Sequence, residues 1–122
     1  MARVVITPIE VTKHSTFEGT VLNSALFKGV DVTNGAEVVM DGHDERTVIM
    51  VQNTATAPGT VTVKAGNGIQ GVADEVFTVP ASSTTFIVPE SGRFKNVSGD
   101  DKGKLIINGS AATITVAVIK LP

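Results

Sequence analysis

The chain lacks cysteine, tryptophan and tyrosine, and its only aromatic residues are five phenylalanines among 122 residues. Without cysteine it can form no disulfide framework, thiolate metal site or cysteine nucleophile. Surfaces that bind carbohydrate or single-stranded nucleic acid usually stack their ligands on Trp, Tyr or several Phe. The shortage of aromatic residues therefore argues against both kinds of surface, and five dispersed phenylalanines are typical of core packing.

The chain also lacks a strong charge and a long apolar run. Its formal net charge of −2 at pH 7 indicates neither nucleic acid nor an acidic membrane as partner. No apolar run approaches the roughly 18 residues of a membrane span. Thr7 and Pro8 interrupt the N-terminal segment before it reaches the length of a signal peptide. We therefore expect a protein made and kept soluble in the cytosol, with no nucleic acid and no membrane as partner.

What the chain has in abundance is short β-branched runs separated by turn residues. Hydrophobic residues make up 42% of the chain and charged residues 18%, which is typical of a globular domain. The clearest run, Arg46–Asn53, lies between the charged turn 41–45 and the turn containing Pro58 and Gly59. Such runs predict strands, and they cover residues 1–6, 36–40, 46–53, 60–64, 75–79, 84–88, 92–96, 104–108 and 112–121.

This spacing predicts an all-β fold, a single-domain antiparallel β-sandwich or barrel without βαβ units. Strands 75–79 and 84–88 are expected to pair through Ala81–Ser83, and strands 104–108 and 112–121 to form a hairpin around Gly109 and Ser110. In strand 60–64, Val61 and Val63 share one face. In the last strand, one face carries Ile114, Val116, Val118 and Lys120.

Residues 9–35 follow neither the strand nor the helix period for long. We therefore divide the chain into an irregular N-terminal arm, residues 1–35, and a β-sandwich domain, residues 36–122. The arm carries five apolar residues that need a surface to lie on: Phe17, Val21, Leu22, Leu26 and Phe27. They can contact a partner or pack on the sandwich of their own chain, and the sequence favours neither.

Two motifs have plain structural explanations. Residues 66–71 spell G-x-G-x-x-G, but a strand rather than a helix follows them, so the glycines are expected to shape a wide loop rather than hold a dinucleotide. Asp41, His43, Asp44 and Glu45 offer metal ligands, yet they sit in one turn with no ligands from other elements, which favours a solvated charged turn. We expect no metal and no cofactor.

No catalytic arrangement is recognisable. The serines lack the G-x-S-x-G context, neither histidine lies beside a nucleophile, and candidate carboxylates such as Asp74, Glu75 and Glu90 stand at turns or strand ends. The sequence therefore predicts that the chain is not an enzyme.

From Arg46 onward the chain resembles the small capsid decoration (head-stabilising) proteins of tailed bacteriophages. The segments that carry the resemblance are 46–53, 60–63, the glycine-rich turn 66–71, 77–81, 84–89, 92–94 and 114–122. The resemblance implies a jelly-roll-like β-sandwich on the virion, bound to the major capsid protein on the outer capsid surface as a homotrimer. The function it implies is stabilisation of the phage head by a protein made in the host cytoplasm.

Two other classes remain open at this stage. A receptor- or carbohydrate-binding β-module of a tail or surface appendage predicts exposed aromatic or convergent polar residues at one end of the sandwich. An enzyme with a site that the sequence does not reveal predicts a closed pocket with perturbed carboxylates or histidines.

Overall fold

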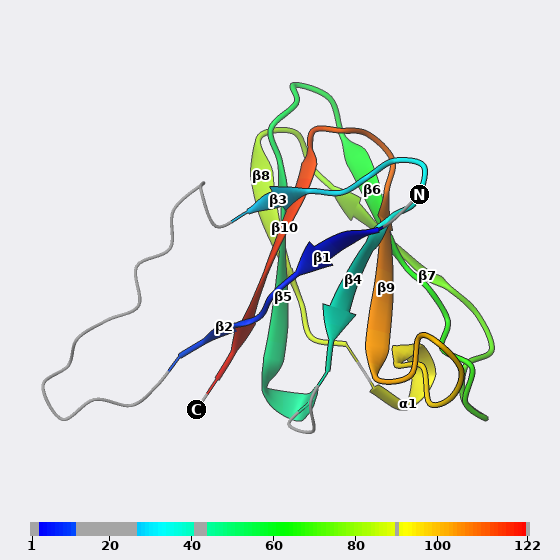
Figure 1. Ribbon diagram of the computed structural model, residues 1–122. Coiled ribbons are helices and arrows are strands. Elements are labelled where there is room, and N and C mark those ends of the chain that lie inside the picture. Colours follow the sequence, from blue (N-terminus) through cyan, green and yellow to red (C-terminus); the bar gives the residue numbers. More distant parts are fainter. Residues whose placement is uncertain (1–2, 12–26, 41–43, 90, 122) are drawn as a thin grey trace, which may run out of the picture.

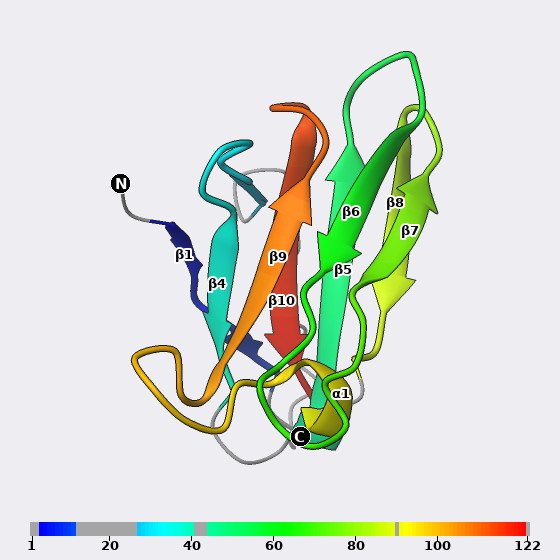
Figure 2. The same ribbon diagram turned by 90° about the vertical axis from the view of Figure 1, so that its right-hand side faces the viewer.

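The computed structural model describes residues 3–11, 27–40, 44–89 and 91–121, which form two β-sheets packed face to face (Figures 1 and 2). In spatial order, sheet A contains β1 (Val4–Ile6), β4 (Ala36–Val39), β9 (Lys104–Gly109), β6 (Gly59–Val63) and β7 (Glu75–Val79). Sheet B contains β2 (Ile9–Glu10), β10 (Ile114–Lys120), β5 (Thr47–Asn53) and β8 (Ser83–Ile87), with β3 (Lys28–Gly29) also paired to β10. The predicted all-β class is confirmed.

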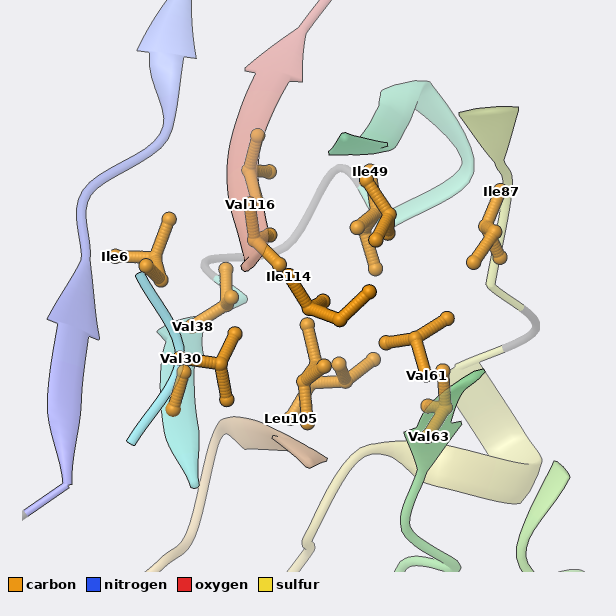
Figure 3. Packing of buried hydrophobic residues seen from close by; sticks show 14 of the residues in the cluster. Ile6, Val30, Val38, Ile49, Val61, Val63, Ile87, Leu105, Ile114 and Val116 are labelled. Carbon is orange, nitrogen blue, oxygen red and sulfur yellow. The ribbon is translucent and has the colours of Figure 1, made fainter. Parts of the chain in front are cut away.

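The core lies between the sheets and consists mainly of aliphatic residues from most of the strands (Figure 3). Alternate side chains of a strand point to opposite faces, and the inward set is buried in both sheets: Val38, Ile49, Val51, Val61, Val63, Leu105, Ile107, Ile114, Val116 and Val118. The predicted shared faces of Val61 with Val63, and of Ile114 with Val116 and Val118, are confirmed.

The N-terminal region takes part in both sheets. β1 pairs in parallel with β4, and β2 pairs in parallel with β10. Ile6 is 2% exposed and Val30 is 3% exposed within the common core. The sheets are therefore mixed, and the prediction of purely antiparallel pairing was wrong. Within the irregular segment 9–35, where one or two strand pieces were expected without being placed, residues 9–10 and 28–29 are short strands because β10 supplies their backbone partners.

Both predicted hairpins were wrong. β7 pairs with β6 and β8 pairs with β5, so the link through Ser82, which has a φ of 53°, carries the chain from one sheet to the other. In the same way β9 pairs with β4 and β6, whereas β10 pairs with β5. Val79 points inward from β7 in sheet A, and Ile87 points inward from β8 in sheet B. The two residues therefore join the same core from opposite layers.

The predicted strand at 92–96 is instead a helical turn, α1 (Ser91–Phe94). It connects β8 in sheet B to β9 in sheet A and buries Phe94 in the core. The backbone N–H of Gly66 donates to the carbonyl of Arg93, 2.8 Å away, and the Arg93 guanidinium lies 3.3 Å from the Glu75 carboxylate. The chain crosses between the two layers here, and Phe94 closes the end of the core.

Candidate protein-binding face

The outward faces of the two sheets differ in charge. On sheet A, the outward face carries Glu37 and Lys104, whose side chains form an ion pair of 2.9 Å. Arg3 extends this group, because its guanidinium lies 3.9 Å from the Glu37 carboxylate and donates to the Asp101 carboxylate at 3.0 Å. The rest of that face alternates between polar residues (Thr60, Thr62, Thr78 and Asn108) and apolar residues (Val5, Val39, Val76 and Ile106), of which the three valines are about half exposed. Sheet A therefore presents a mixed, solvated surface, as expected for a sheet face in contact with water.

The outward face of sheet B carries no charged residue among the described strand positions. We name this surface the uncharged face; the registers of β2, β5, β8 and β10 place on it Ile9, Val48, Met50, Gln52, Thr84, Phe86, Thr115, Ala117 and Ile119. Its polar members, Gln52, Thr84 and Thr115, are neighbours, because Gln52 is paired with both threonines. The remainder forms a continuous apolar area.

Three residues show how this area is packed. Met50 is paired with Phe86 on one side and Ala117 on the other. Met50 and Ala117 are 2% and 1% exposed although they point away from the core, whereas Phe86 is 67% exposed. The open part of the uncharged face is therefore its β8 side, where Phe86 and Thr84 are exposed.

The structure describes one of the five arm residues predicted to contact a partner. Phe27 is half-buried, and the antiparallel register of β3 with β10, continued by one residue, places it beside Ala117 at the margin of the uncharged face. The other four, Phe17, Val21, Leu22 and Leu26, lie outside the described residues. Contact of these four residues with a partner therefore stays a prediction.

The sequence missed the uncharged face itself, although a signal was present. In β5 the run Val48–Val51 is apolar in both phases of the strand period, and in β10 the run Val116–Ile119 is as well. A strand that is apolar on both faces is typically covered on both faces. The two strands are paired over seven residues, so their second apolar phases combine into one surface.

A second apolar surface lies at the end of the sandwich near α1. Ile69 and Val72, in the loop between β6 and β7, are 99% and 81% exposed, and Val97 is 53% exposed. The side chain of Asn67 joins the two loops, because it accepts from the Val97 N–H at 2.7 Å and donates to the Ser98 carbonyl at 2.9 Å. This loop contains the G-x-G-x-x-G motif and leads into strand β7.

The chemistry-bearing residues do not converge on a site in the part of the chain described. Asp41 and His43 lie outside it, and Asp44 and Glu45 belong to a 3₁₀ turn over Asp44–Arg46. Among the described residues no group of three or more His, Asp or Glu side chains could hold a metal ion. The helices in this part of the chain are too short and polar to cross a membrane.

No family model, curated protein or solved structure matches this chain. The geometry of the described residues, and above all the uncharged face, is therefore the basis for a functional proposal.

Proposed function

We propose that this protein is a structural virion protein that binds the outer surface of a phage capsid and stabilises the head. The observation that supports the proposal is the contrast between the two outward faces. One carries an ion-pair network around Glu37, and the other is uncharged and leaves Phe86 two-thirds exposed. A protein whose role is to bind a large surface needs a rigid scaffold and one apolar face.

In this proposal the uncharged face lies against the shell and the outward face of sheet A lies toward solvent. Burial of apolar surface is favourable by about 25 cal/mol per Å² before the costs of association are subtracted. Each contact can be modest, because a capsid presents the same site many times and the stabilisation is repeated at each.

The finer features of the proposal follow the resemblance of residues 46–122 to capsid decoration proteins. They are a jelly-roll-like arrangement of the sandwich, the major capsid protein as partner, and assembly as a homotrimer at threefold positions. The connections of β7 to β8 and of β9 to β10, each of which crosses from one sheet to the other, are compatible with a jelly roll, in which successive strands alternate between layers.

The test is co-sedimentation of the purified protein with capsids assembled from the major capsid protein of the same phage. Ile119→Lys places a charge on the uncharged face beside Val48, its direct cross-strand partner. Ile106→Lys is the matched control, since Ile106 is half-buried on the outward face of sheet A, opposite Glu37. Circular dichroism establishes that both variants are folded.

We expect the wild type and Ile106→Lys to sediment with capsids, and Ile119→Lys to bind at least about tenfold more weakly, since each factor of ten corresponds to about 1.4 kcal/mol. Absence of wild-type binding would refute the proposed function. Equal binding by both lysine variants would refute the assignment of the uncharged face.

The alternative of a receptor- or carbohydrate-binding module expects exposed aromatic residues at one end of the sandwich. Among the described phenylalanines, Phe86 is the exposed one, and it lies on a sheet face. The end near α1 presents the aliphatic residues Ile69, Val72 and Val97 instead. These positions favour a protein partner over a sugar, because aliphatic side chains do not provide the stacking surface of an aromatic ring.

A further inference from the structure

β8 is a free edge of sheet B. It pairs with β5 on one side, and no described strand pairs with it on the other. It lies at the side of the sandwich opposite β1, as Figure 2 shows. An edge strand has unpaired backbone N–H and C=O groups, and the ligand that satisfies a row of such groups is another extended strand.

This edge also lacks the charged residues and prolines that usually prevent an edge strand from pairing. Residues 81–88 contain no charge and no proline, and they include the exposed Phe86 and Val88. The other described edge strands each carry or adjoin a charge: Glu75 in β7, Arg3 before β1, Glu10 in β2 and Lys28 in β3. Native edges are usually protected from pairing by such charges or by proline. The lack of protection is therefore confined to β8.

We propose that β8 is where a second copy of this chain binds, by antiparallel pairing of β8 with its twofold-related copy. A second copy fits this edge because an antiparallel twofold contact satisfies the free backbone groups of both strands at once, and no charged residue within 81–88 opposes it. Pro80 and Pro89 lie beyond the two ends of the strand and limit the pairing to the residues between them.

The register follows from the strand length. Centring the twofold axis on Thr85 pairs all five residues of each β8, with Ser83 opposite Ile87 and Thr84 opposite Phe86. Phe86 and Thr84 both lie on the uncharged face, so the two Phe86 rings become diagonal neighbours, a separation that aromatic side chains can span. The uncharged faces of the two copies then join into one surface that runs across the axis.

The contact is isologous, which means that both copies use the same surface around a twofold axis. It is therefore separate from a threefold contact and can exist together with it. On a capsid, twofold pairing through β8 would connect neighbouring trimers. The inference does not depend on capsid binding, because the purified chain alone tests it.

The experiment measures the mass of the purified protein by light scattering across a dilution series, for the wild type, Phe86→Lys and Val5→Lys. Phe86→Lys introduces two like charges across the proposed axis. Val5→Lys is the matched control: Val5 is also on an edge strand, β1, and is 51% exposed, but it lies on the opposite side of the sandwich. Hydrogen exchange at Thr84–Phe86 provides a second measurement.

We expect the wild type and Val5→Lys at high concentration to have at least double the mass of Phe86→Lys, and the exchange protection of Thr84–Phe86 to fall on dilution. The mass of Phe86→Lys reports the basic unit, whether one chain or three, so the trimer proposal is tested separately. Equal masses for all three proteins at every concentration would overturn the inference. Equal loss of mass in both variants would also overturn it, because the effect would not be specific to β8.

Discussion

The side-chain amide of Asn53 donates a hydrogen bond to the carbonyl of Val79, 3.2 Å away. Asn53 ends β5 in sheet B and Val79 ends β7 in sheet A, so this bond links the two layers. The same amide donates to the Ala57 carbonyl at 2.9 Å, and the side-chain oxygen accepts from the Ala55 N–H at 3.0 Å. Asn53 is 1% exposed; its buried polar atoms are thus satisfied by groups of the fold itself, which gives it a structural role.

Replacing Asn53 with alanine should lower the free energy of unfolding by about 2–3 kcal/mol, since it leaves the Ala55 N–H and two carbonyls without their partner. Urea unfolding followed by circular dichroism measures the change. Gln52→Ala is the neighbouring control; Gln52 is half-buried on the uncharged face, and its loss should lower the stability by less than about 1 kcal/mol. Similar losses for the two variants would contradict the linking role.

Acid should remove the stabilisation that Asp74 provides. The backbone N–H of Ala65 and the ammonium group of Lys64 bond the carboxylate and lower its pKa below the ordinary value. A carboxyl group whose pKa is lowered by folding stabilises the protein above its unfolded-state pKa of about 4, and this contribution is lost as the pH falls through the lowered value.

Asp74→Asn keeps an acceptor for Ala65 but removes the charge, so we expect it to be less stable than the wild type at neutral pH and to converge with it in acid. Urea unfolding at a series of pH values measures the difference. Asp100→Asn, in an exposed turn, serves as the control. A gap between Asp74→Asn and the wild type that stays constant down to about pH 2 would contradict the assignment.

The glycine-rich loop should tolerate a methyl group at Gly68 but not at Gly71. A Cβ at Gly71 would overlap the backbone carbonyl of Gly66, which is itself buried, whereas a Cβ at Gly68 would meet the Val97 side chain at an ordinary 3.6 Å. Overpacking of this kind typically destabilises by about 1–3 kcal/mol. We expect Gly71→Ala to lower the melting temperature clearly and Gly68→Ala to leave it nearly unchanged. If Gly71→Ala melts with the wild type, the close crossing is absent in solution.

The N-terminal strand should contribute to the stability of the whole sandwich. Ile6→Ala should lower the free energy of unfolding by about 2–5 kcal/mol because Ile6 is buried in the common core. Val5→Ala, one residue earlier and half exposed, should lower it by less than about 1 kcal/mol. Denaturant titration of the two variants compares the losses. A small effect at Ile6 would show that β1 is docked only weakly.

The sequence predicted the strands well because each depends on local pattern. Seven of the nine expected strands, from residues 36–40 through 112–121, agree with the structure within about two residues at each end, and the first, expected over residues 1–6, is observed as β1 over Val4–Ile6. It did not predict which strands pair. Ala81–Ser83 reads equally well as a hairpin turn or as a crossing between layers, because both need a tight reversal. What decides between them is that β7 pairs with β6 and β8 pairs with β5, and both of these partners come earlier in the chain.

The uncharged face was not predicted for a similar reason. The second apolar phases of β5 and β10 are visible in the sequence, but their union into one surface depends on the pairing of Met50 with Ala117 and Phe86. One or two strand pieces were expected within 9–35, but β2 and β3 could not be placed because residues 9–10 and 28–29 carry no strand pattern of their own. They are strands only because β10 lies beside them.

The most direct test of the proposed function is a cryo-electron microscopy reconstruction of capsids of the same phage incubated with the purified protein. Our account predicts added density on the outer surface around threefold positions, with β5 and β10 of each copy facing the shell and the Glu37–Lys104 ion pair facing solvent. A shell without added density would contradict the account, as would copies bound with the outward face of sheet A against the capsid.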